Sequence, residues 1–149
     1  MSNNRPGPTQ LEQYPHTYSL TTRWMDNDVY GHVNNVVYYS YFDTIINRFL
    51  IEQAGLDIHQ SGSIGLMVQS QCQYFSSVAY PDQLIGGFSV EKVGRSSVDY
   101  NIAIFKQNSI DAAAVGKLTH VFVNRETRNS MPIPPIILTA LLSAKLKAN

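Results

Sequence analysis

The stretch NNVVYYSYFDTIINRFLIEQAG, residues 34–55, carries the longest helical signal in the chain. Asn34 or Asn35 can accept hydrogen bonds from the free N–H groups of a first turn, and Gly55 suits the left-handed residue that ends a helix. Polar residues fall on one stripe and include an i, i+4 pair of Arg48 and Glu52. The rest of the circumference is apolar, so this helix is predicted to be enclosed by other structure, with a curved sheet as its expected partner.

A period of two governs most of the remaining chain and predicts strands. They cover residues 18–24, 66–74, 84–93, 97–106 and 114–124. In residues 66–74 we expect Leu66, Val68, Cys72 and Tyr74 to share one apolar face. Residues 114–124 are apolar on both faces, which favours a central strand. Prolines then precede a predicted terminal helix over residues 136–147. The expected architecture is a single α+β domain in which an antiparallel sheet wraps one long helix.

Length and composition set the class of protein. A chain of 149 residues with 44% apolar and 15% charged residues fits one packed domain, which we place at residues 16–149 after a flexible N-terminal arm over residues 1–15. There is no apolar run of membrane-spanning length and no signal-peptide pattern. The single cysteine, Cys72, agrees with a reducing compartment. We expect a soluble, cytoplasmic protein.

The charges are balanced overall but not along the chain. A formal net charge of zero argues against a protein that binds nucleic acid by neutralising many phosphates. Residues 1–91 sum to −5 and residues 92–149 to +5. An anionic ligand would therefore meet its positive field in the second half of the chain.

One segment, residues 23–35, concentrates reactive groups: RWMDNDVYGHVNN. Two carboxylates and a histidine stand just before a helix start, where free N–H groups and the helix dipole stabilise negative charge on a bound carbonyl oxygen. A carboxylate there could act as a base or a nucleophile. The competing interpretation is structural: Asp26 and Asn34 would satisfy turn and cap N–H groups, and His32 would be a hydrogen-bonded histidine.

Other chemistries fit this sequence poorly. An EF-hand loop fails at its fifth and twelfth positions, Tyr30 and Val37, and His32 lacks a second ligand at zinc spacing. No Gly-x-Ser-x-Gly elbow, phosphate loop or dinucleotide fingerprint is present. We therefore expect neither a metal nor a cofactor.

The motif Asp26-x-Asp28-x-x-Gly31-His32-Val33-Asn34-Asn35-x-x-Tyr38, followed by Tyr74 and Pro81-Asp82, resembles the 4-hydroxybenzoyl-CoA thioesterase branch of the hotdog-fold superfamily. The Gly-His-Val-Asn-Asn form is similar to its bacterial acyl-CoA thioesterases, and the resemblance covers roughly residues 17–130. It implies a hotdog fold and a homodimer or dimer of dimers. It also implies an active site shared between subunits and hydrolysis of an acyl-CoA thioester.

Carried over by position, the resemblance implies Asp28 as the nucleophile or general base and the backbone amide of Asn35 as the group that polarises the carbonyl, with His32 as a further candidate. The sequence also offers residues for substrate binding. Tyr38, Tyr41, Phe42 and Met67 could line an acyl pocket or form part of the core, and Arg95, Ser96 and Ser97 could contact a CoA phosphate or form an ordinary turn.

Two alternatives stay open from the sequence. The first is a hotdog dehydratase or hydratase that acts on acyl-CoA or acyl-carrier-protein substrates, for which a histidine with an acid is expected. The second is a non-catalytic acyl-CoA binder on the same fold. The acyl group and the choice between CoA and acyl carrier protein as its carrier are also open.

Overall fold

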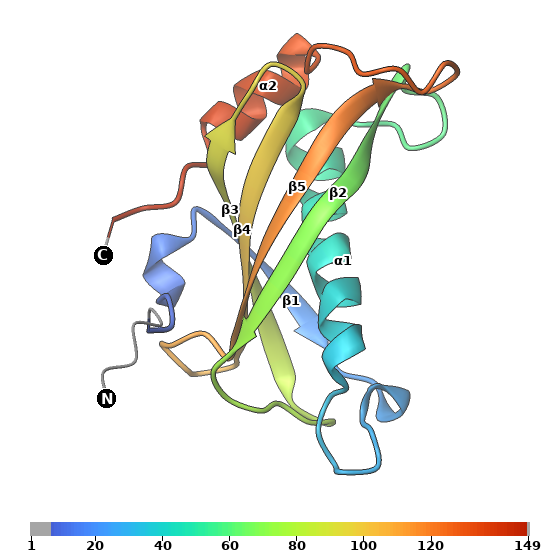
Figure 1. The fold of residues 1–149 in the computed structure, drawn as a ribbon. Coiled ribbons are helices and arrows are strands. Elements are labelled where there is room, and N and C mark those ends of the chain that lie inside the picture. Colours follow the sequence, from blue (N-terminus) through green and yellow to red (C-terminus); the bar gives the residue numbers. More distant parts are fainter. Residues whose placement is uncertain (1–6, 149) are drawn as a thin grey trace, which may run out of the picture.

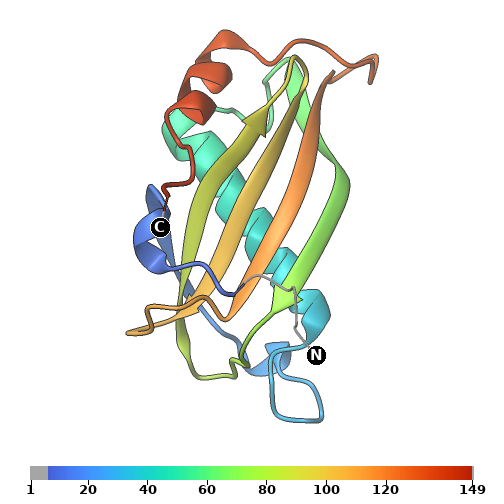
Figure 2. The ribbon, with the colours of Figure 1, turned by 60° about the vertical axis from the view of Figure 1, so that its left-hand side comes forward.

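The computed structural model describes residues 7–148. Its elements are η1 (Leu11–Gln13), β1 (His16–Thr21), η2 (Trp24–Asp26), α1 (Asn35–Ala54), β2 (Ser63–Tyr74), β3 (Gln83–Val93), β4 (Ser97–Lys106), β5 (Ala114–Asn124) and α2 (Pro135–Leu142). The five strands form one antiparallel sheet in the order β1-β3-β4-β5-β2. The helix α1 crosses one face of this sheet, and α2 lies beside the C-terminal end of α1 (Figures 1 and 2). This is the hotdog fold, and the predicted α+β architecture is confirmed.

The long helix begins and ends where its cap residues predict. The Asn34 side chain accepts a hydrogen bond from Val36 N at 3.0 Å, and Gly55 ends the helix with φ of 67°. The sheet lies close to α1 because two glycines give it room. A Cβ on Gly116 would stand 2.6 Å from Phe42, and one on Gly86 would overlap the side chain of Ile45. The apolar face of α1 is thus buried against the middle of the sheet, as expected.

The prediction for β2 is wrong in one respect: its apolar residues do not share a face. A bulge between Met67 and Gln69 shifts the register with β5. Leu66 pairs with Val121, which puts Leu66 on the outer face, whereas Cys72 and Tyr74 face α1 with their partners Gly116 and Ala114. Leu66, Met67 and Val68 are 38%, 38% and 60% exposed. The middle of this edge strand is therefore apolar and uncovered.

The C-terminal helix is shorter than predicted. It ends at Leu142, because the chain then turns to run along β3. Val90 N donates to the carbonyl of Ala144 at 2.8 Å, and Leu146 N donates to the carbonyl of Val90 at 3.2 Å. Backbone bonds to Val90 of β3, and one from Lys147 N to the carbonyl of Gln13, thus replace the helical bonds beyond Ala144. Within residues 7–148, no helix is long and apolar enough to cross a membrane.

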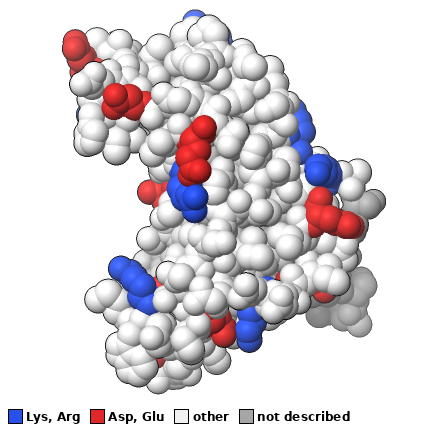
Figure 3. Space-filling view, turned by 180° about the vertical axis from the view of Figure 1, so that it is seen from behind, with Lys and Arg blue, Asp and Glu red and all other residues white. Residues whose placement is uncertain are grey.

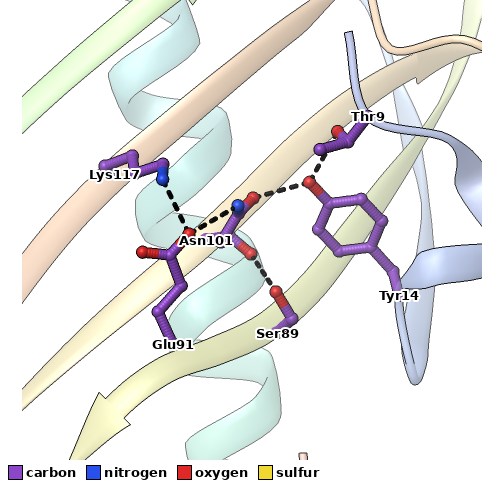
Figure 4. Close-up of polar contacts among 6 residues, drawn as sticks. All are labelled: Thr9, Tyr14, Ser89, Glu91, Asn101 and Lys117. Carbon is purple, nitrogen blue, oxygen red and sulfur yellow. Dashed lines mark hydrogen bonds and ion pairs between the residues drawn. The ribbon is translucent and has the colours of Figure 1, made fainter. Parts of the chain in front are cut away.

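The outer face of the sheet, opposite α1, carries a polar network (Figure 4). The Tyr14 hydroxyl donates to Asn101 Oδ1 at 2.6 Å, and Asn101 Nδ2 donates to Glu91 Oε1 at 3.0 Å, which also accepts from Lys117. The ring of Tyr14 lies over Gly87. The expected flexible arm falls partly on residues 1–6, which lie outside the described residues, but residues 9–14 pack on the sheet.

Candidate active site

The loop between β1 and α1 lies at the N-terminal end of the long helix (Figure 1). It begins at η2, where the Asp26 side chain accepts from Arg23 N at 2.9 Å and from the Tyr41 hydroxyl at 2.7 Å. It ends where Asn34 N donates to the carbonyl of Asp26 at 2.9 Å. Val33 N is bonded to the carbonyl of Val78 at 2.9 Å. Both ends of the loop are therefore fixed to the body of the molecule.

Asp28 stands inside this loop in a tight turn. Its N–H donates to the carbonyl of His32 at 2.9 Å, and Gly31, with φ of 85°, donates back to the carbonyl of Asp28 at 3.1 Å. The carboxylate accepts one hydrogen bond, from Tyr30 N to Oδ1 at 2.8 Å. Within residues 7–148 its second oxygen accepts none, so this oxygen is available to a substrate or to water.

The first turn of α1 offers a backbone donor near this carboxylate. The Asn34 side chain takes the N–H of Val36, and the carbonyl of Asn34 takes the N–H of Val37. The N–H of Asn35 has no acceptor in the described part of the chain. The Tyr74 hydroxyl donates to the carbonyl of Asn35 at 3.2 Å and so links the helix start to β2. A free N–H at a helix N-terminus is suited to binding a developing oxyanion.

These groups line one pocket of about 370 Å³. Its walls come from the loop, the start of α1 and the end of β2: Asp28, Tyr30, His32, Val33, Asn35, Tyr38, Tyr74, Phe75, Ser76 and Ser77. Asp28 also lines a second, wider hollow of about 730 Å³, together with Trp24, Val29 and Tyr30. Asp28 thus borders two hollows.

The titratable groups around the pocket are held in defined states. Burial raises the pKa of Tyr38 and of Tyr74, so both phenols stay protonated at neutral pH. Burial opposes ionisation of Asp26, but hydrogen bonds from Tyr41 and Arg23 and the Arg23 charge outweigh it and lower the pKa of this carboxyl. Asp26 is therefore an ionised, buried anchor.

The structure brings together some of the residues predicted for the site and separates others. Asp28, His32, Asn35 and Tyr38 line the same pocket. Tyr41 and Phe42 do not line it: Phe42 is fully buried over Gly116. For these two, the core is the correct alternative, because their side of α1 faces the sheet.

The remaining predicted substrate contacts lie away from the pocket. Met67 pairs with His120 on β5, toward the other end of β2. Arg95, Ser96 and Ser97 lie at the β3–β4 turn, at the opposite end of the sheet from the loop before α1 (Figure 1). The face seen in Figure 3 carries scattered charged side chains, several of opposite sign side by side, on a largely uncharged surface. Within one chain, the pocket at Asp28 is therefore not lined by Met67, Arg95, Ser96 or Ser97.

Sequence reasoning missed Ser76 and Ser77, which supply hydroxyl groups to the pocket wall. Their signal was weak, since two serines before a proline-containing turn are typical of any strand end. Across residues 7–148 no three histidine, cysteine or acidic side chains stand close enough together to hold a metal ion.

Comparisons with known proteins identify the family of this chain. The family model described as the thioesterase-like superfamily matches residues 22–141, and the chain belongs to that superfamily. The fold and the family make it a thioesterase of the hotdog class. A search of curated proteins finds no match.

Solved structures show the same fold. The PA5185 protein of Pseudomonas aeruginosa is 44% identical, with a TM-score of 0.93 over 95% of this chain and 99% of that one. A 1,4-dihydroxy-2-naphthoyl-CoA thioesterase of Synechocystis is 17% identical, with a TM-score of 0.76 over 85% and 94%. The SAV2348 protein of Staphylococcus aureus, solved in complex with CoA, is 15% identical, with a TM-score of 0.80 over 99% and 92%.

Proposed function

We propose that this protein hydrolyses acyl-CoA thioesters, with Asp28 as the catalytic carboxylate and the Asn35 amide as the oxyanion donor. The observation that carries the proposal is that two groups line one pocket: a carboxylate whose second oxygen accepts no hydrogen bond and a helix-start N–H that has no acceptor, both judged within residues 7–148. The thioester carbonyl would accept from the Asn35 N–H while its carbon is attacked from the side of Asp28. A positioned base contributes about 10²–10⁴-fold and an oxyanion donor about 10²–10³-fold.

Two routes use the same groups. In one, Asp28 attacks the carbonyl carbon, the thiolate of CoA leaves, and water hydrolyses the resulting anhydride to regenerate the carboxylate. In the other, Asp28 takes a proton from a water that attacks the carbon, and the thiolate then leaves and is protonated. Both routes give the free acid and CoA. Single turnover in ¹⁸O-labelled water identifies the first route when water attacks the aspartyl carbon of the anhydride, because ¹⁸O then enters Asp28 and the released acid is unlabelled.

CoA is the carrier we favour over acyl carrier protein. Two structures with the same fold involve CoA: one is named for a naphthoyl-CoA substrate and the other was solved with CoA bound. The Arg95 turn offers a guanidinium and two hydroxyls to phosphate, but it lies at the far end of its own subunit. If two copies pair antiparallel along β2, the Arg95 turn of one subunit would contact the CoA bound at the active site of the other.

We infer such pairing, a homodimer or a dimer of dimers, from the uncovered apolar edge of β2. Antiparallel pairing along this edge would place the Ser63 end of one strand beside the Tyr74 end of the other, and hence beside the other subunit's Asp28 pocket. The single cysteine fits a reducing compartment, and we place the reaction in the cytoplasm.

Free-thiol release from acetyl-, octanoyl-, palmitoyl- and benzoyl-CoA tests the proposal and ranks the acyl groups. A rate of thiol release that is proportional to enzyme concentration, on at least one of these substrates, supports the proposal. The competing function is hydration of an enoyl-CoA, because His32 lines the same pocket as Asp28. Hydration without thiol release, or acyl-CoA binding without either reaction, would overturn hydrolysis as the function.

A further inference from the structure

Asp26, two residues before Asp28, is a buried carboxylate that the proposed chemistry does not use. Its side chain is 0% exposed, and both of its oxygens are occupied. Oδ2 accepts from Arg23 N and from the Tyr41 hydroxyl, while Oδ1 accepts from Arg23 Nε and forms an ion pair with Arg23 Nη2, each at 3.0 Å. Asp26 therefore cannot reach a substrate and has no acceptor capacity left for one.

The same residue joins the three parts of the site. Its side chain accepts from Arg23 N, at the start of η2, and from the Tyr41 hydroxyl on α1. Its backbone carbonyl accepts from Asn34 N and so joins the two ends of the loop. Asp28 is the second residue after this anchor, and Asn35 is the residue after Asn34. The positions of the Asp28 carboxylate and of the Asn35 amide thus both depend on Asp26.

We propose that Asp26 and Tyr41 are positioning residues that hold the Asp28 carboxylate in register with the Asn35 amide. The inference deepens the proposed function and depends on it. Attack on a carbonyl carbon held by an oxyanion donor requires both groups in place together, and a misplacement of about 1 Å can cost about 10²-fold in rate. The Arg23 side chain is 64% exposed, and an ion pair with an exposed partner contributes little to stability, so we assign this cluster a geometric role.

Tyr41→Phe tests the inference, because it removes one hydroxyl and keeps the ring. Tyr14→Phe is the matched control: it also removes a buried phenol hydrogen bond, to Asn101 on the outer face of the sheet. We expect both variants to fold. The kcat of Tyr41→Phe should fall about 10-fold, because one hydrogen bond to a charged group is lost, while its KM should stay within about twofold of the native value. Tyr14→Phe should keep the native kcat. Native kcat in Tyr41→Phe would overturn the inference.

Asp26→Asn perturbs the cluster more strongly than Tyr41→Phe does, because an amide NH₂ group would replace one acceptor oxygen and face the N–H donors of Arg23. We expect kcat to fall about 10²-fold. Trp24, the single tryptophan, lies in η2 beside Asp26 and reports a shift of the loop through its fluorescence without any turnover. Unchanged fluorescence with unchanged kcat would contradict a positioning role.

A double variant separates positioning from general destabilisation. If Tyr41 acts through Asp28, then Tyr41→Phe has no further effect once Asp28→Asn is in place. Equal effects of Tyr41→Phe in both backgrounds would overturn the inference while leaving the proposed function intact. A native rate in Asp28→Asn alone would instead remove Asp28 from the mechanism, and the two failures are therefore distinguishable.

Discussion

Asp26 and Asp28 are the same residue type two positions apart, yet their surroundings are opposite. Within residues 7–148 the buried Asp26 side chain accepts three hydrogen bonds and forms an ion pair with Arg23, whereas the Asp28 side chain accepts one hydrogen bond and lines two hollows. The sequence offered both carboxylates for structure or chemistry. The difference between them depends on Tyr41, whose position on the sheet-facing side of α1 is set by tertiary packing. Spacing alone could not reveal it.

Gly116 is a position where a single methyl group should matter. A Cβ there would stand 2.6 to 2.8 Å from three atoms of the Phe42 ring, which is fully buried and has no room to move. We expect Gly116→Ala to lower the free energy of unfolding by about 1–3 kcal/mol. Urea denaturation measures this. Gly62→Ala is the control, since nothing lies within 4 Å of its Cβ, and an equal loss in both variants would contradict the packing argument.

His120 should make stability depend on pH. Burial lowers its pKa from 6.5 to about 4, with the Asp43 charge opposing the shift, and Nδ1 is bonded to the Tyr100 hydroxyl at 3.1 Å. Between about pH 4 and pH 6.5 the His120 side chain binds a proton in the unfolded chain but not in the folded one. The stabilising contribution is therefore complete above pH 6.5 and is lost as the pH falls toward 4, by roughly 3 kcal/mol.

The check is the free energy of unfolding at pH 7 and at pH 5, for the native protein and for His120→Phe. Burial also lowers the pKa of His16, so a smaller slope of the same sign should remain in the variant. A slope that is unchanged in His120→Phe would show that other groups cause the pH dependence.

At the scale of elements, α1 was predictable and β2 was only partly so. The bounds of α1 depend on local residues, Asn34 and Gly55, whose capping chemistry is visible in the sequence. The bulge in β2 depends on its pairing with β5, more than 40 residues away, and a one-residue shift moves every side chain before it to the other face. The end of α2 is likewise set by backbone bonds to β3.

The C-terminal cap of α1 gives a graded prediction. Gly55 has φ of 67°, a left-handed conformation in which a side chain is strained, while the nearest atom to its Cβ, on Ile136, stands at an unstrained 3.9 Å. Gly55→Ala should therefore cost about 1 kcal/mol of unfolding free energy through the backbone alone, and Gly55→Asn clearly less. Thermal denaturation of both variants measures this order. The reverse order would mean that contacts at the cap outweigh its backbone conformation.

For the whole molecule, the order of periodic segments in the sequence predicted the fold class. It did not predict which residues contact one another across the sheet. Residues 9–14 show no periodicity, yet Tyr14 fits the space above Gly87 and bonds Asn101. Tyr41 and Phe42 could have lined a pocket or the core, because the apolar face of α1 is wide. Both outcomes depend on which residues meet across the sheet.

The uncovered edge of β2 predicts a dimer in solution. Val68 is 60% exposed in the middle of the strand, next to the bulge. A lysine there would place a charge in an apolar strand-to-strand interface, so Val68→Lys should shift the protein from dimer toward monomer. Light scattering after size exclusion measures the molar mass. Ile110→Lys, at a 69% exposed position between β4 and β5, is the control, and equal masses for native protein and Val68→Lys would contradict pairing along β2.

The central claim is that the Asp28 carboxylate carries hydrolysis of an acyl-CoA. The most direct test is the rate of free-thiol release by Asp28→Asn, which keeps the side chain's shape and removes its charge, against Asp111→Asn as a matched surface control outside the pocket. The account predicts a loss of about 10²–10⁴-fold in Asp28→Asn and a native rate in Asp111→Asn. A native rate in Asp28→Asn, with the fold intact, would contradict it.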